Sequence, residues 1–139
     1  MSRILAIDFG TKRIGLAVTD PLQIIASPLD TIPNKDILTY LKAYFQKEEV
    51  DKLIVGMPKN LQNQDTHSTD NVRKFILKLA ESFPTIEIIT IDERFTSKMA
   101  FQTMIDGGLK KKDRQNKETV DKLSATIILQ SYMQSSSSY

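Results

Sequence analysis

The stretch AIDFGTKRIG, residues 6–15, decides how this chain begins to fold. An apolar run leads directly into Asp8, glycines follow where a tight turn would fall, and a second apolar run begins at Ile14. Two such runs joined by a glycine-containing turn predict a β-hairpin. Burying an unpaired charge is costly, so Asp8 either is paired or emerges at the rim of a sheet, where it holds something positive.

The bulk composition is that of an ordinary soluble domain. The chain has 139 residues, of which 40% are hydrophobic and 26% are charged, and this length suggests one domain with a real core. No apolar stretch approaches the length of a membrane span, and the first residues lack the features of a signal peptide. The absence of cysteine excludes disulfides and thiolate metal sites and is typical of a cytoplasmic protein. We expect a single domain over residues 1–134, a disordered tail at residues 135–139 and no membrane partner.

The hydrophobic pattern along the rest of the chain alternates between strand and helix periods. Expected strands cover residues 3–8, 14–19, 52–57 and 86–91, with a further strand, weakened or kinked by Pro28, at 23–31. Expected helices cover residues 35–48, 72–83 and 118–134, with a short one from Thr96 or Ser97 to Gly107-Gly108. This order predicts an α/β fold with a mixed sheet and helices on both faces.

Acidic residues stand at the ends of these core elements. Asp8 ends the first strand, Asp92 and Glu93 follow the last strand, and Asp121 lies in the first turn of the last helix. Carboxylates that converge at one edge of a sheet repel one another, so they need a divalent cation. Magnesium is bound through a few carboxylates together with waters and phosphate oxygens. Two such ions can activate a water and stabilise the leaving oxygen of a phosphodiester.

Each acid also has a simpler explanation. Asp8 can cap the turn that follows it through backbone N–H groups. The helix dipole favours Asp121 in a first turn, and Glu93 can pair with a neighbouring cation. Asp20 precedes a proline and is typical of a turn, and a capping or solvated role is favoured for His67, the single histidine. Only the combination of acids favours a functional site.

A basic segment precedes Asp121. The net charge of +2 gives no strong global attraction to nucleic acid, but residues 110–117 hold five cations and one anion. The cations are Lys110, Lys111, Lys112, Arg114 and Lys117. From charge alone such a run is more often a solvated loop than a phosphate contact. If Asp121 belongs to a phosphodiester site, the run lies beside that site and the phosphate contact is favoured. Few aromatic residues accompany it, so a stacking platform for single strands is not evident.

Four motifs in this chain resemble the YqgF family. They are DFGTKRIGLAVTD at 8–20, VGMP at 55–58, DERFTS at 92–97 and ETVDKLSATIILQ at 118–130. The resemblance runs from residue 3 to about residue 133. Members are described as Holliday-junction resolvases and as nucleases that mature the 5′ end of 16S ribosomal RNA. The resemblance implies a ribonuclease-H-like fold with a five-stranded mixed sheet.

The resemblance also implies a catalytic site. Asp8, Glu93 and Asp121 would hold Mg²⁺ or Mn²⁺, and Asp92 is the alternative to Glu93. Polar positions beside them that could touch phosphate are Lys12, Arg13, Arg94 and Thr96. One departure from the family is the segment 59–65, which lacks the glycine that members usually carry there.

The implied activity is that of a hydrolase, a metal-dependent nuclease acting in 5′-end maturation of pre-16S ribosomal RNA. Its partners would be structured RNA and the ribosome or a pre-ribosomal particle. One alternative is a resolvase of branched DNA in recombination and repair, which favours a homodimer over a monomer because two symmetric cuts are needed. A second is a non-catalytic RNA-binding factor in ribosome assembly. A third is the nucleotide-binding hairpin of sugar kinases and Hsp70-type ATPases, which require two such domains.

Overall fold

The apolar run that ends in Asp8 forms the central strand of a five-stranded sheet. The computed structural model describes residues 2–57, 67–92 and 117–136. Within them the strand order is β3-β2-β1-β4-β5. The strands are β1 (Arg3–Asp8), β2 (Arg13–Thr19), β3 (Ala26–Pro33), β4 (Val50–Met57) and β5 (Glu87–Asp92). β1 pairs antiparallel with β2 and parallel with β4, so the predicted hairpin and the predicted mixed sheet are confirmed.

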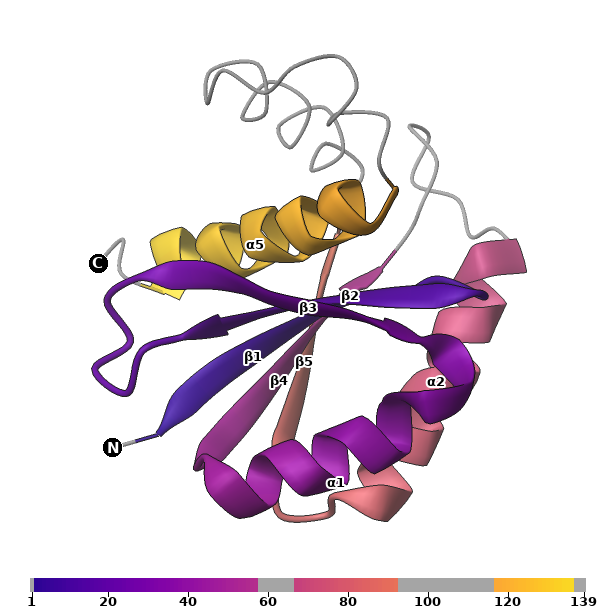
Figure 1. Cartoon of the computed structure of the whole chain (residues 1–139), viewed down its shortest axis with the longest axis horizontal. Coiled ribbons are helices and arrows are strands. Elements are labelled where there is room, and N and C mark those ends of the chain that lie inside the picture. Colours follow the sequence, from indigo (N-terminus) through magenta and orange to yellow (C-terminus); the bar gives the residue numbers. More distant parts are fainter. Residues whose placement is uncertain (1, 58–66, 93–116, 137–139) are drawn as a thin grey trace.

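Helices cover both faces of this sheet, as the sequence predicts. They are η1 (Asn34–Asp36), α1 (Ile37–Lys47), α2 (His67–Ser82) and α5 (Lys117–Ser136). Figure 1 shows α1 and α2 on one side of the sheet and α5 on the other. The short helix expected between residues 96 and 108 lies outside the described residues. In the part of the chain that is described, no helix is both long and apolar enough to cross a membrane.

Strand alternation divides the core into two layers. Leu5 and Ile7 pack into the layer beneath α1 and α2, whereas Ile4 and Ala6 pack into the layer beneath α5. All four side chains are buried, at 3% exposure or less. Burial on both faces explains why this strand reads as a continuous apolar run instead of an alternating one.

Asp20 organises the turn between β2 and β3. Its carboxylate accepts hydrogen bonds from the N–H groups of Ile24 and Ile25, each at 2.8 Å, and of Leu22 at 3.2 Å. The N–H of Ile25 contributes most to holding the pKa of Asp20 below its usual value. The turn role expected for Asp20 is therefore confirmed. Because these N–H groups are bound to a side chain, β3 begins at Ala26 and not at residue 23.

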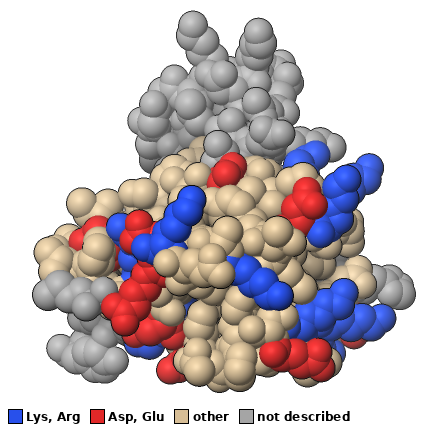
Figure 2. Space-filling model, turned by 60° about the horizontal axis from the view of Figure 1, so that its bottom comes forward, with Lys and Arg blue, Asp and Glu red and all other residues tan. Residues whose placement is uncertain are grey.

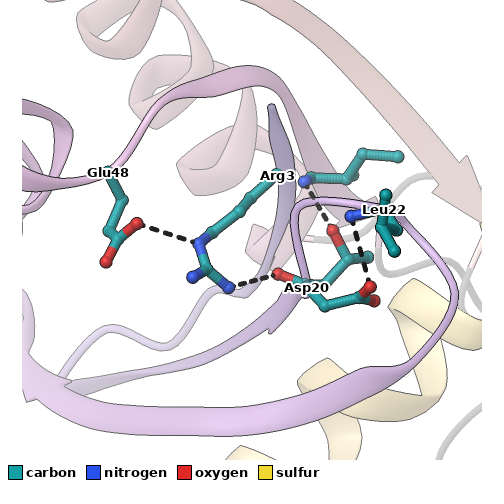
Figure 3. Close-up of polar contacts among 6 residues, drawn as sticks. Arg3, Asp20, Leu22 and Glu48 are labelled. Carbon is teal, nitrogen blue, oxygen red and sulfur yellow. Dashed lines mark hydrogen bonds and ion pairs between the residues drawn. The ribbon is translucent and has the colours of Figure 1, made fainter. Parts of the chain in front are cut away.

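A second set of polar contacts fixes the start of β1. The Arg3 guanidinium donates to the Glu48 carboxylate at 3.1 Å and to the carbonyl oxygen of Thr19 at 3.0 Å, as Figure 3 shows. The buried Thr19 hydroxyl accepts the N–H of Ile4 at 2.9 Å. These contacts tie the first residues of β1 to the end of β2 and to the end of α1. The opposite end of β1, where Asp8 lies, is left clear of them.

Candidate functional site

Asp8 lies at the end of the sheet that holds the C-termini of the three parallel strands, which is called the common edge below. β1, β4 and β5 run in the same direction, so their last residues, Asp8, Met57 and Asp92, share one edge. Met57 is in register with Asp92. Adjacent strands lie about 4.8 Å apart, so the ends of β1 and β5 are separated by about 10 Å across β4. The topology therefore brings Asp8 and the end of β5 to a common edge.

Asp8 is half-buried and shares a face with the residues beneath α5. Side chains along β1 point alternately to the two faces of the sheet, so residues separated by an even number of positions share a face, or have the same parity. Asp8 has the parity of Ile4 and Ala6, which belong to the α5-side layer. Its backbone is paired with Gly15 of β2. Asp8 therefore belongs to the α5 side of the sheet.

Helix α5 runs toward the same edge when followed from its C-terminus to its N-terminus. Met133 near its end lines a cleft together with Ile4, at the start of β1. The N-terminal part of α5 therefore extends toward the carboxyl ends of the parallel strands, an arrangement that Figure 1 shows. The helix begins at Lys117, so Asp121 is its fifth residue, one residue deeper than expected and just past the first turn. Because the helix dipole acts mainly on the first turn, this position weakens the dipole explanation for that acid.

The turn that follows Asp8 is tightly held. Asn34 donates from Nδ2 to the carbonyl oxygen of Gly10 at 2.7 Å, and its backbone N–H donates to the carbonyl oxygen of Lys12 at 2.9 Å. A Cβ atom at Gly10 would stand well inside van der Waals contact of the carbonyl oxygen of Arg13. The turn therefore requires glycine at position 10 for steric reasons. Sequence reasoning missed Asn34, whose only signal was its place directly after Pro33.

An open cleft of about 270 Å³ lies between this turn and α2. It is lined by Phe9, Thr11, Asn34, Asn71, Lys74, Phe75 and Lys78. Sequence reasoning did not select the two lysines, because the helical pattern identifies only the buried face of α2. A larger cleft of about 650 Å³ at the far end of β1 has no charged side chain among the described residues that line it. Of these two clefts, the smaller one is adjacent to Asp8, because Phe9 and Thr11 line it.

Several residues predicted for the site fall outside the described residues. They are Glu93, Arg94, Thr96, Lys110, Lys111, Lys112 and Arg114, and the segment 59–65 joins them. Asp92 ends β5, Lys117 begins α5 and His67 begins α2. Lys12 is exposed in the turn after Asp8, and Arg13, the first residue of β2, is half-buried.

The available donors fit a hard divalent cation. Within residues 2–57, 67–92 and 117–136, no three histidine, cysteine or acidic side chains come together. Asp8 supplies a half-buried carboxylate at the common edge, and the other candidate ligands are also carboxylates. Oxygen donors of this kind suit Mg²⁺ and Mn²⁺.

Comparison with known proteins agrees with this architecture. Residues 2–135 match the family described as "RuvX: Holliday junction resolvase". A protein of Flavobacterium psychrophilum named "Putative pre-16S rRNA nuclease" is 56% identical over 133 residues, covering 96% of this chain and 97% of the relative. A protein of Phocaeicola vulgatus with the same name is 55% identical over 135 residues, covering 97% of both chains.

Solved structures show the same fold. The structure described as T. thermophilus RuvC in complex with a Holliday junction substrate matches with a TM-score of 0.60 and 14% identity, over 99% of this chain and 98% of that one. A second structure of Thermus thermophilus RuvC matches with a TM-score of 0.55 and 13% identity, over 95% of this chain and 96% of that one. At this level of identity the likeness concerns the fold alone, and it confirms the predicted ribonuclease-H-like architecture.

Proposed function

The chain belongs to the RuvX (YqgF) family of nucleases, and on this premise we propose that it hydrolyses phosphodiester bonds of pre-16S ribosomal RNA with divalent metal ions. The observation that carries this proposal is the position of Asp8, half-buried at the edge where β1, β4 and β5 end. RNA is preferred to a DNA junction because relatives about half identical to this chain are named as rRNA nucleases. The reaction would take place in the cytoplasm, in a domain spanning residues 1–134.

We assign Asp8, Glu93 and Asp121 as the catalytic, metal-binding acids. Strand alternation favours Glu93 over Asp92 as the second acid. Ile89 and Ile91 pack into the layer beneath α5, and Glu93 is the next residue with their parity. Asp8 also has the parity of the α5-side residues in its own strand.

Helical spacing supports the third acid. Asp121 precedes Ala125 by four residues, which is about one turn of an α-helix. Ala125 is fully buried in the layer beneath α5. From this spacing we expect Asp121 to lie on the stripe of α5 that faces the sheet.

The residues of the chain would divide the work between ligands and phosphate contacts. Magnesium or manganese ions bound by the three acids would activate water and stabilise the leaving oxygen. Asp8 would keep its carboxylate in a fixed place, because it ends a buried strand and precedes a clamped turn. Phosphate contacts would come from Lys12, Arg13, Arg94, Thr96 and the basic segment 110–117. In the cell the substrate would be presented by the ribosome or a pre-ribosomal particle.

A cleavage assay tests the proposal. End-labelled pre-16S RNA, unstructured RNA and a four-way DNA junction are incubated with magnesium, manganese or chelator. The assay compares wild type, Asp8→Asn and a control, Asp51→Asn. The control makes the same chemical change at an exposed position on β4. Metal-dependent cutting of pre-16S RNA by wild type and control, lost in Asp8→Asn with binding largely kept, is the expected result. Full cleavage by Asp8→Asn would show that Asp8 is not a catalytic residue.

The junction substrate distinguishes the second candidate function. The family description names Holliday junction resolvases. Cutting of the junction alone would favour that activity, and sedimentation should then reveal a dimer, because two symmetric cuts need two sites. Firm RNA binding without cleavage under every condition would favour an assembly factor.

A further inference from the structure

The cleft between the β1–β2 turn and α2 combines cations with neutral hydrogen-bond donors. On α2, Asn71, Lys74, Phe75 and Lys78 follow a spacing of three and four residues, so they share one face of the helix. Phe75 is only 5% exposed and its ring lies 4.9 Å from that of Phe9. Both rings line the cleft, and the polar side chains that α2 contributes to it are exposed.

The two lysines have no acidic partner in the described part of the chain. The nearby carboxylate of Asp70 pairs instead with Arg73, at 3.6 Å. No carboxylate is found among the described residues that line the cleft. Like charges spaced by four residues on a helix repel each other, so an anion between Lys74 and Lys78 would be favourable. A phosphate group has the oxygens to accept from two ammonium groups, an amide and a hydroxyl at once.

The cleft begins one residue after Asp8. Phe9 and Thr11 line it, and they belong to the same clamped turn that fixes the end of β1. The cleft opens on the α2 side, whereas Asp8 has the parity of the α5 side. Figure 2, a view of the face that carries α1 and α2, shows several basic side chains, with some acidic ones among them, along the side where α2 and the start of β2 lie in Figure 1.

We propose that this cleft binds a backbone phosphate of the nucleic-acid strand that is cut at Asp8, a few nucleotides from the cut. The proposal rests on the proposed nuclease function for the identity of the strand. A contact of this kind fixes the register of the substrate without reading its sequence. It would hold the strand where it passes over the β1–β2 turn, from the α5 side of the sheet to the α2 side.

The first test measures binding of a pre-16S RNA fragment in chelator, where no cleavage occurs, over a series of salt concentrations. The variant is Lys74→Gln/Lys78→Gln. The control is Lys42→Gln/Lys47→Gln, which removes two exposed lysines from α1 that do not line the cleft. We expect the cleft variant alone to bind about fivefold more weakly and to lose roughly 0.7 from its log–log salt slope, the change for one phosphate contact on a single strand. Lys74→Arg/Lys78→Arg should bind like wild type.

A second test locates the contact on the substrate. Single phosphates near the cut are replaced one at a time by neutral methylphosphonates. One or two such replacements should weaken binding to wild type and to the α1 control but leave binding to the cleft variant unchanged. Thermal unfolding of each variant checks that the fold is intact.

The outcomes separate this proposal from the proposed function. If wild type cuts RNA and the cleft variant binds like the α1 control, the cleft proposal is wrong and the nuclease assignment stands. If no metal supports cleavage but the cleft variant loses affinity and its response to one methylphosphonate, the cleft is a phosphate site and the nuclease assignment fails.

Discussion

The side chain of Asn34 holds the carbonyl oxygen of Gly10 in a 2.7 Å hydrogen bond across 24 residues of sequence. The backbone N–H of Asn34 binds the carbonyl oxygen of Lys12 in the same turn at 2.9 Å. The end of the edge strand β3 is thus fastened to the turn that follows Asp8. The position of the Asp8 carboxylate, at the carboxyl end of β1, depends on the conformation of the turn that follows it. The two hydrogen bonds from Asn34, called the clamp here, therefore support the site as well as the fold.

Removing the clamp should lower activity more than stability. Asn34→Ala deletes the side-chain hydrogen bond, and we expect the free energy of unfolding to fall by about 1 kcal/mol. The single-turnover cleavage rate at saturating RNA should fall by about tenfold, because misplaced catalytic groups lose much of their effect. Thr39→Ala, at an exposed position on α1, is the control. A cleavage rate equal to that of the control would show that the clamp has no positioning role.

Gly10 should tolerate no side chain. In Gly10→Ala the new Cβ would collide with the carbonyl oxygen of Arg13, a backbone atom that can move only if the turn moves. We expect a loss of about 1–3 kcal/mol in the free energy of unfolding, as for other overpacked sites, together with loss of cleavage. Urea unfolding and the cleavage assay measure the two effects. Combined with Asn34→Ala, the losses should not add, since both changes disturb one turn; strict additivity would contradict a shared mechanism.

The main architecture could be predicted because its signals are local. The apolar run before Asp8 has the composition of a doubly buried strand, and the stripe from Val72 to Phe83 has the period of a helix packed on one face. Boundaries were less certain where polar residues decide them. Helix α2 begins at His67 and not at residue 72, because its polar first turn carries no part of the apolar stripe.

The site could be predicted only in part. Asp8 stood out because an acid directly after an apolar strand is unusual, and its place at the common edge follows from the parallel pairing of β1, β4 and β5. Asn34, Lys74 and Lys78 gave no comparable signal. Their surroundings arise from contacts between segments far apart in the chain, and a single sequence does not reveal which polar residues face one another across such a contact. The roles of Glu93 and Asp121 stay predictions.

The two adjacent acids after β5 should behave differently. Because Glu93 has the parity of Ile89 and Ile91, Glu93→Gln should abolish cleavage and weaken binding of Mn²⁺. Asp92→Asn has the opposite parity and should keep most of its activity. Titration of Mn²⁺ by electron paramagnetic resonance and the cleavage assay provide independent readouts. If Asp92→Asn is the inactive variant, the alternation of β5 does not continue to residue 93 and the assignment must be exchanged.

The turn at Asp20 should make stability depend on pH at the acid end. The N–H groups of Ile25, Ile24 and Leu22 hold the pKa of its carboxyl below the ordinary value of 3.8 in the folded protein. The unfolded chain therefore binds the proton at a higher pH, and the stabilisation is complete above about pH 4 and lost as the pH falls through the folded pKa.

Asp20→Asn removes this titration, although its amide oxygen can still accept from two of the N–H groups. The difference in unfolding free energy between wild type and Asp20→Asn should be largest near neutral pH and shrink below pH 4 in urea titrations. Asp51→Asn corrects for the loss of one exposed negative charge. A difference that stays constant from pH 7 to pH 3 would mean that the charge on Asp20 contributes nothing to the turn.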